Sequence, residues 1–211
     1  MVMPHDDSGL RRSALRMRNE ARILEAAQHV FANYGYHGAT IDRVAERARM
    51  SQPNLHNYFK TKADLYAAVL EQTLDVWLGL IDNLNGSEDP ATGLRRYISQ
   101  KMAMSRQFPD ASRVFANEIL RGAPVLKPQI RGKVRDNVEH FRQVIDNWVA
   151  AGKLKPVDAY HLIFLIWGAT QHYADFQSQI KAILDVPRLA KADFDAAADS
   201  ICSIVLDGLM P

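Results

Sequence analysis

Polar side chains that both donate and accept hydrogen bonds are concentrated in one short stretch near the front of the chain. They are Gln52, Asn54, His56 and Asn57. Amide and imidazole groups match the donor and acceptor patterns that base pairs present in the major groove of DNA. We therefore predict that residues 51–59 form a recognition helix and that these four side chains contact base edges.

The elements that must position these side chains are two short helices joined by a tight turn. Apolar residues recur at helical spacing through residues 41–48, with charged residues on the other face. Thr40 precedes this run and is a natural N-cap, because its hydroxyl can accept from the free amides of the first turn. Ser51 is the expected N-cap of the second helix, where Pro53 falls in the first turn and is tolerated. This pattern is typical of a helix-turn-helix.

Residues that flank the two helices are expected to contact the DNA backbone. Thr40, Arg49, Tyr58 and Lys60 are assigned to phosphates, and Ser51 completes the predicted DNA-binding set. Phosphate contacts position a protein on DNA without reading its sequence. Operator preference is therefore expected to depend on the base-facing group alone.

The charge distribution supports a polyanionic partner for the front of the chain only. Residues 1–62 carry a formal charge of +4, and the remainder carries −2, within a total of +2. A basic front on a neutral to acidic body indicates nucleic acid binding by the front. The alternative is that these are ordinary solvated surface charges with no specific partner.

Bulk composition places the chain among ordinary globular proteins. Of its 211 residues, 47% are hydrophobic and 24% are charged. The single cysteine, Cys202, excludes an intramolecular disulfide and fits a reducing compartment. The front has no signal-peptide pattern, and the longest apolar run, residues 162–169, is too short to span a bilayer. We expect a soluble cytoplasmic protein with no membrane association.

The periodicity predicts an all-α fold of about nine helices. Residues 1–17, which include Arg11, Arg12 and Arg16, are expected to be a flexible basic arm. Residues 18–65 are predicted to form the DNA-binding domain, and residues 66–211 a helical body. The expected helices span about 18–35, 41–48, 51–59, 62–84, 91–108, 110–122, 129–151, 157–184 and 192–209.

The last two predicted helices are long and apolar around most of their circumference. Such helices must be buried on several sides. Pairing with the same helices of a second copy would form a four-helix bundle, so we predict a homodimer through the last two helices. The alternative is that both helices form the core of a monomer.

This arrangement resembles the TetR family of transcriptional regulators. The matching positions are Phe31, Gly35, Tyr36, Thr40, Ile41, Ala45, Ala48, Ser51, Leu55, Tyr58, Phe59, Lys60, Lys62 and Leu65. The resemblance implies a regulator, in most cases a repressor, that binds a palindromic operator as a dimer and is released by a small molecule.

Two positions depart from the family pattern. Arg49 stands where the turn usually has glycine, and a non-glycine residue in a left-handed turn costs about 1 kcal/mol. A phosphate contact by Arg49 would offset this cost. His56 stands where the family often has tyrosine, so one backbone contact is expected to differ.

The body carries a second, narrower resemblance, to the branch of that family that regulates pyrimidine utilisation. The similar segments are residues 108–115, 120–124, 152–156 and 161–176. The resemblance implies that uracil or thymine binds the C-terminal domain and weakens DNA binding. Relatives that bind other small hydrophobic or aromatic ligands are the alternative.

A candidate effector site follows from aromatic and amide side chains in the body. Gln171 lies at i+4 from Trp167, so both share one helical face. A primary amide suits the alternating carbonyl and N–H edge of a pyrimidinedione, and an aromatic plane can stack on its ring. Core packing is the alternative for each tryptophan. The predicted ligand-binding set is Trp77, Trp148, Trp167, Gln171, His172 and Tyr173.

Other classes of protein are less well supported. The chain has no His-Glu-x-x-His, no glycine-rich phosphate loop and no Gly-x-Ser-x-Gly, so neither an enzyme nor a cofactor is predicted. His172 and Asp175 are spaced to ligate a metal, but a surface or interface pair is the favoured interpretation. An architectural DNA-binding protein with no effector is the third class, and ligand-induced thermal stabilisation distinguishes it from a sensor.

Overall fold

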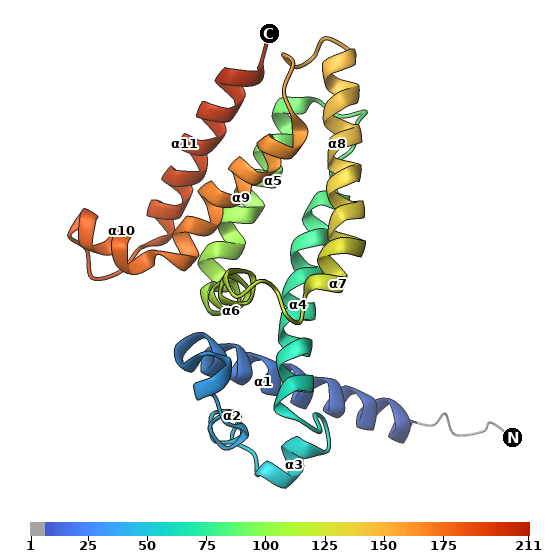
Figure 1. Cartoon of the computed structure of the whole chain (residues 1–211), viewed down its shortest axis with the longest axis vertical. Coiled ribbons are helices and arrows are strands. Elements are labelled where there is room, and N and C mark those ends of the chain that lie inside the picture. Colours follow the sequence, from blue (N-terminus) through green and yellow to red (C-terminus); the bar gives the residue numbers. More distant parts are fainter. Residues whose placement is uncertain (1–6) are drawn as a thin grey trace, which may run out of the picture. The chain divides into compact units, whose positions relative to one another are not determined.

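The computed structural model describes residues 7–211, and this part of the chain is helical with no β-strand (Figure 1). The predicted all-α class is therefore confirmed. The chain divides into two compact units, Met1–Leu70 and Glu71–Pro211. The predicted domain boundary after residue 65 and the observed division after Leu70 both fall within one helix, α4 (Lys62–Asp82).

The first unit contains α1 (Asp7–Gly38), α2 (Ile41–Arg47), α3 (Gln52–His56) and the start of α4. The conformation of Gly35 (φ 64°, ψ 175°) interrupts α1 at the predicted end of the first helix. Helix α1 begins at Asp7 and not near residue 18, so residues 7–17 of the predicted arm are helical; the remainder of the arm, residues 1–6, lies outside the described residues. Good helix formers such as Ala14, Leu15 and Met17 favour this extension of α1.

Side-chain caps fix where the short helices begin. The Thr40 hydroxyl accepts a hydrogen bond from the Arg43 amide (3.3 Å), as predicted. At the start of α4, the Thr61 amide donates to the Asp64 carboxylate (3.0 Å) and the Asp64 amide donates to the Thr61 hydroxyl (3.1 Å), which completes a capping box. Ser51 occupies the N-cap position of α3 but makes no side-chain cap hydrogen bond. Pro53 removes one of the two amides that an N-cap normally engages.

The second unit continues with helices that surround one large core. Their bounds are α5 (Pro90–Gln107), α6 (Pro109–Leu120), α7 (Lys127–Gln129), the π-helical segment η1 (Ile130–Val134), α8 (Arg135–Ala150), α9 (Ala159–Asp175), α10 (Gln177–Leu184) and α11 (Lys191–Leu209). Helix α5 packs against both α9 and α11, and these three helices lie together in Figure 1. Apolar side chains of α5, α8, α9 and α11 fill the core between them.

Two predicted helices of this unit are divided in the structure. The helix expected over residues 157–184 breaks at Phe176 (φ −115°, ψ 29°), which separates α9 from α10. Before α8, Gly132 (φ −96°, ψ −108°) leaves the helical region and the chain forms η1. Glycine is the residue least restrained to helical angles, which accounts for the second irregularity. No glycine or proline marks the break at Phe176, so the sequence alone gives no signal for it.

Membrane-spanning segments were not expected from the apolar runs. Among the described residues, no helix is both long enough and apolar enough to cross a bilayer.

Candidate functional site

The short helix α3 presents polar side chains at the surface of the first unit. Gln52, Asn54 and Asn57 are exposed and His56 is half-buried, while Leu55 is fully buried beneath them. The regular helix is shorter than the predicted 51–59, but turn-type hydrogen bonds continue its path to Phe59. Leu55 therefore packs into the core of the first unit, and the amide side chains of α3 face outward. A helix that reads bases needs this arrangement.

Contacts with neighbouring elements hold both ends of this motif. The Tyr58 hydroxyl accepts a hydrogen bond from Asn19 Nδ2 of α1 (2.9 Å), and the Arg16 guanidinium lies 5.5 Å from the Tyr58 ring centre. Lys62 Nζ donates to the Ala39 carbonyl (3.0 Å). Tyr58 is thus partly engaged within the protein, although its hydroxyl hydrogen remains able to donate to a phosphate.

The turn between α2 and α3 contains the predicted left-handed residue. Arg49 has a φ of 52°. Its amide donates to the Glu46 carbonyl, and the Met50 amide donates to the Ala45 carbonyl, both at 3.0 Å. These two bonds define a Schellman motif, in which the left-handed position is usually glycine. The side chain of Arg49 is exposed, and so is that of Lys60.

In the second unit, three of the predicted ligand residues have other roles in the structure. Trp148 is only 1% exposed, and its indole N–H donates to the Gly86 carbonyl (3.0 Å). His172 is exposed and stacks on Phe176, with ring centres 4.9 Å apart. Tyr173 packs against Phe194 of α11. None of these contacts involves the other predicted ligand residues, so the candidate ligand site is built on Trp77, Trp167 and Gln171, although the charge of His172 also acts on Asp175 of that site.

The remaining predicted residues are half-buried: Trp77 lies on α4, and Trp167 and Gln171 lie on α9, which packs against α5. Tyr97 and Lys101 lie one helical turn apart on α5, and Trp167, Gln171 and Asp175 follow at successive i+4 positions on α9. The Trp167 indole N–H donates to the Tyr97 hydroxyl (2.7 Å) at one end. At the other end the charge of Asp175 acts on Lys101.

Lys101 is the most unusual member of this group, which we call the Lys101 cluster (Trp77, Tyr97, Lys101, Ser112, Trp167, Gln171 and Asp175). Its side chain is only 3% exposed, and its ammonium lies 4.3 Å from the centre of the Trp77 ring. The Ser112 hydroxyl of α6 donates to Asp175 Oδ1 (2.7 Å). Phe115, also of α6, meets the Trp77 ring in an edge arrangement at 4.8 Å.

Burial shifts the protonation equilibria of this cluster. Removal from water lowers the pKa of Lys101 to about 7, and the charge of Asp175 only partly opposes that shift. Burial also raises the pKa of Asp175, against the opposing effects of the Ser112 hydrogen bond and the charges of Lys101, Arg113 and His172. An amine and a carboxyl group displaced toward neutrality in the same buried place are typical of a functional site.

Four members of the cluster were not among the ligand residues predicted from the sequence, namely Tyr97, Lys101, Ser112 and Asp175. A signal for Lys101 was present, because it occupies a position on the apolar face of its helix, between Ile98 and Met102. A charged residue at such a position is seldom buried without a specific purpose. Within residues 7–211, no group of three or more His, Cys, Asp or Glu side chains is arranged to hold a metal ion.

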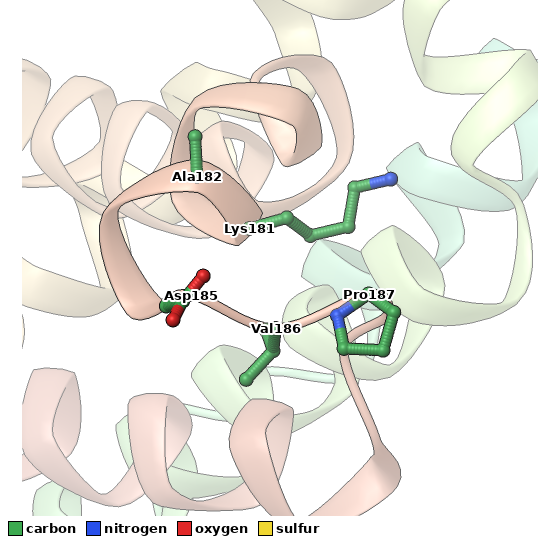
Figure 2. A pocket seen from close by; sticks show the side chains of 5 residues that line it. All are labelled: Lys181, Ala182, Asp185, Val186 and Pro187. Carbon is green, nitrogen blue, oxygen red and sulfur yellow. The ribbon is translucent and has the colours of Figure 1, made fainter.

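A separate hollow of about 520 Å³ lies at the turn that follows α10 (Figure 2). Its lining residues are Lys181, Ala182, Asp185, Val186 and Pro187. None of the predicted ligand residues and no aromatic ring lines it. A flat heterocyclic ligand would therefore find fewer suitable partners there than at the Lys101 cluster.

Comparisons with known proteins match both units. Residues 23–69 match the family model described as bacterial regulatory proteins, tetR family, and residues 70–211 match that described as YcdC-like protein, C-terminal region. The HTH-type transcriptional regulator RutR of Escherichia coli (strain K12) is 37% identical over 204 residues, which cover 97% of this chain and 96% of that protein. The HTH-type transcriptional activator FasR of Mycolicibacterium smegmatis is 44% identical over 69 residues, 32% of each chain.

Solved structures agree with this result at the level of the fold. A bacterial regulatory protein in the tetR family from Rhodococcus RHA1 superposes with a TM-score of 0.71 at 21% identity, over 90% of this chain and 95% of that one. The transcriptional regulator SCO4942 from Streptomyces coelicolor gives a TM-score of 0.69 at 24% identity, over 90% and 98%. With family models matching residues 23–211 and a relative aligned along nearly its whole length, the exposed polar helix and the helical body have a common explanation: the chain belongs to the TetR family of bacterial transcriptional regulators.

Proposed function

We propose that this DNA-binding regulator acts as a repressor that a pyrimidine, such as uracil or thymine, releases from its operator. The observation that carries the effector assignment is the buried ammonium of Lys101, held between the Trp77 ring and the charge of Asp175. A buried cation destabilises a helical core unless a partner compensates it. Ligand recognition is a reason to keep such a residue.

The chemistry of a pyrimidinedione fits the Lys101 cluster. Its ring edge alternates carbonyl oxygens with N–H groups. The Lys101 ammonium donates to a carbonyl, the Asp175 carboxylate accepts from an N–H, and the Gln171 amide can do either. Trp77 and Trp167 offer aromatic surface to the flat ring. A regulator that senses a different small aromatic molecule is the alternative, since much of this chemistry suits other polar heterocycles.

The connection between effector and DNA runs along the chain through α4. This helix begins in the first unit at Lys62 and carries Trp77 in the second. A ligand that contacts Trp77 and binds one conformation of α4 better than another would shift the population of DNA-binding states. The proposed mechanism is therefore a population shift, in which effector and DNA each favour a different conformation.

The homodimer is proposed through α9 and α11. Large apolar side chains remain exposed on both helices, including Phe164 (53%), Leu165 (57%) and Ile204 (73%). Exposed apolar groups gathered on neighbouring helices are typical of an interface. A second copy would cover them and place two recognition helices on the two halves of a palindromic site. Light scattering during size-exclusion chromatography tests this state, and a monomeric mass at micromolar concentration would contradict it.

The effector proposal is tested with uracil, thymine, cytosine and adenine. Each compound is added to the full chain in a thermal denaturation assay and in a mobility-shift assay on DNA that the protein selects from a random library. We expect uracil or thymine to raise the melting temperature, because a ligand that binds only the native state stabilises it. The same compound should release the selected DNA. No shift with any of the four would contradict the pyrimidine assignment, although DNA binding itself would remain.

The variant Gln171→Ala tests whether this side chain contacts the effector. We expect the variant to bind the selected DNA normally but to need at least about tenfold more pyrimidine for release, the equivalent of one lost hydrogen bond at about 1.4 kcal/mol. Gln179→Ala is the matched control, because Gln179 is exposed on α10 outside the Lys101 cluster. An unchanged response in Gln171→Ala would remove this residue from the effector site.

A further inference from the structure

An arginine-lined hollow of about 500 Å³ lies in the first unit, at the junction of α1 with the end of α2. Arg22 comes from α1, Arg47 is the last residue of α2, and Arg49 belongs to the turn that follows. The remaining lining residues are Glu25, Ala26 and Ala48. Three guanidinium groups therefore outnumber a single carboxylate around one concave surface.

These guanidinium groups are available to an external partner. Arg22 Nη2 donates to Asn19 Oδ1 at 3.3 Å, which is a weak hydrogen bond to a neutral group. Throughout the described part of the chain, neither Arg47 nor Arg49 takes part in an ion pair. The planar fork of arginine matches phosphate geometry better than the ammonium of lysine does. The hollow is thus suited to an anion with several acceptor oxygens.

The backbone of Arg49 provides a second, independent observation. Two other helices, α6 and α8, end in the same pair of hydrogen bonds, and both have glycine at the left-handed position, Gly122 (φ 86°) and Gly152 (φ 69°). Only α2 has a side chain there among these three ends. A left-handed non-glycine residue costs about 1 to 2 kcal/mol. Such strain tends to persist where the side chain has a function.

We propose that Arg22, Arg47 and Arg49 form a single site for a backbone phosphate of DNA. The inference rests on the proposed function and deepens it, because Arg49 lies two residues before Ser51 at the start of the recognition helix. A phosphate held there would fix the depth and register of α3 without reading any base. The Glu25 carboxylate beside the arginines would weaken this contact and limit non-specific binding.

The salt dependence of DNA binding separates a phosphate contact from a base contact. Each phosphate that a protein neutralises on duplex DNA contributes about 0.9 to the slope of log K against log salt. Loss of the contact in both subunits of a dimer should therefore reduce the slope by about 1.8. The loss should be the same on any DNA sequence, because phosphates are identical at every position.

The experiment uses the full chain and two fluorescent duplexes, one of random sequence and one that the protein selects from a random library. The anisotropy of each duplex is measured at several KCl concentrations. Arg22→Gln and Arg47→Gln should each weaken binding to both duplexes and reduce both slopes. The double variant should lose little more than either single variant, because all the arginines serve one phosphate. Fully additive slope losses would overturn the single site. Both positions are exposed, so we expect the circular dichroism spectrum to be unchanged.

Two further variants serve as controls. Glu25→Gln, in the same hollow, should strengthen binding, because it removes the one negative charge. Lys191→Gln removes an exposed cation from the second unit and should leave the slope unchanged. Unchanged slopes in both arginine variants, or a loss confined to the selected DNA, would overturn the proposal. Failure of the wild-type protein to bind either duplex would instead refute the proposed function.

Discussion

Arg49 in the first unit and Lys101 in the second are both cations at positions that are unfavourable for folding, but for opposite reasons. Arg49 is exposed, and its cost arises from the left-handed backbone at φ 52°. The backbone of Lys101 is ordinary α-helix, and the free-energy cost at this position arises from the removal of a charged amine from water. One residue strains the backbone to present a charge, whereas the other retains a charge where the core would favour an apolar group.

The difference matches the partner that each unit is proposed to bind. An exposed guanidinium keeps its charge at every physiological pH, which suits a polyanion such as DNA. A buried amine with a pKa of about 7 can be charged or neutral near neutral pH, and its hydrogen-bonding partners are few and well defined. This suits a small ligand recognised by a few polar atoms. In the roles proposed above, both residues exchange stability for function.

Lys101→Met should give the largest stability change of any variant considered. The pKa of Lys101 is about 7 in the folded protein, compared with 10.5 for an unburied lysine. Between these values the unfolded chain binds the proton and the folded chain does not, so stability rises with pH across this window. Below about 7 both states are protonated and the full penalty applies, which is on the order of 5 kcal/mol. Methionine should remove that penalty, since it has similar length and helix propensity.

Urea denaturation followed by tryptophan fluorescence measures this effect. The chain has three tryptophans, Trp77, Trp148 and Trp167, and all of them lie in the second unit. We expect Lys101→Met to raise the denaturation midpoint at pH 6.5 and to flatten the rise in stability between about pH 7 and about pH 10. Lys191→Met, at an exposed ion pair of α11, should change stability by less than about 0.5 kcal/mol. Equal destabilisation by Lys101→Met at both ends of the pH range would contradict the assignment of a desolvated amine.

Asn54→Ala should affect DNA recognition by an intermediate amount and should leave folding unchanged. Asn54 is exposed on α3, so its removal creates no cavity. If its amide reads a base edge, the variant should lose about 1 to 3 kcal/mol on the selected operator and much less on random DNA. Mobility-shift titrations on both DNAs make the comparison, with Asn33→Ala of α1 as the control. Equal losses on both DNAs would assign Asn54 to the backbone, and the contrast between a base-reading helix and a phosphate-binding turn would disappear.

Local signals explain why much of the first unit could be predicted from the sequence. The Thr40 cap and the stop at Gly35 depend on residues within a few positions along the chain, whereas the left-handed turn at Arg49 was expected from the family resemblance. The missed part of this unit is the helix over residues 7–17, where polar and charged residues suggested an arm although several of them are good helix formers.

The second unit was less predictable because the break at Phe176 has no sequence signal and because the candidate site depends on tertiary packing. Neither the break at Phe176 nor the π-helical segment η1 follows from a proline or a capping motif. The i, i+4 spacing identified Trp167 and Gln171, but spacing within one helix cannot show that Lys101 of α5 and Asp175 of α9 share a buried site. Trp148 was predicted as a ligand residue; in the structure it is buried, and its indole N–H donates to the Gly86 carbonyl. Composition alone does not distinguish these two roles of tryptophan.

Arg49→Gly should produce the smallest effect on folding and tests the first half of the comparison directly. Relief of the left-handed strain should stabilise the first unit by about 1 kcal/mol. Part of this gain is lost because glycine increases the conformational entropy of the unfolded chain. Native-state hydrogen exchange of the buried Val44 and Ala45 amides reports on this unit.

The reciprocal control is Gly152→Ala in the second unit, where an added Cβ would meet no other atom within 4 Å, so only the backbone conformation is changed. Gly152→Ala should destabilise its own unit by about 1 kcal/mol or more. If Arg49→Gly gains no protection while Gly152→Ala loses stability, then the arginine side chain contributes to the fold itself, and the strain at this turn is not evidence of a role in DNA binding.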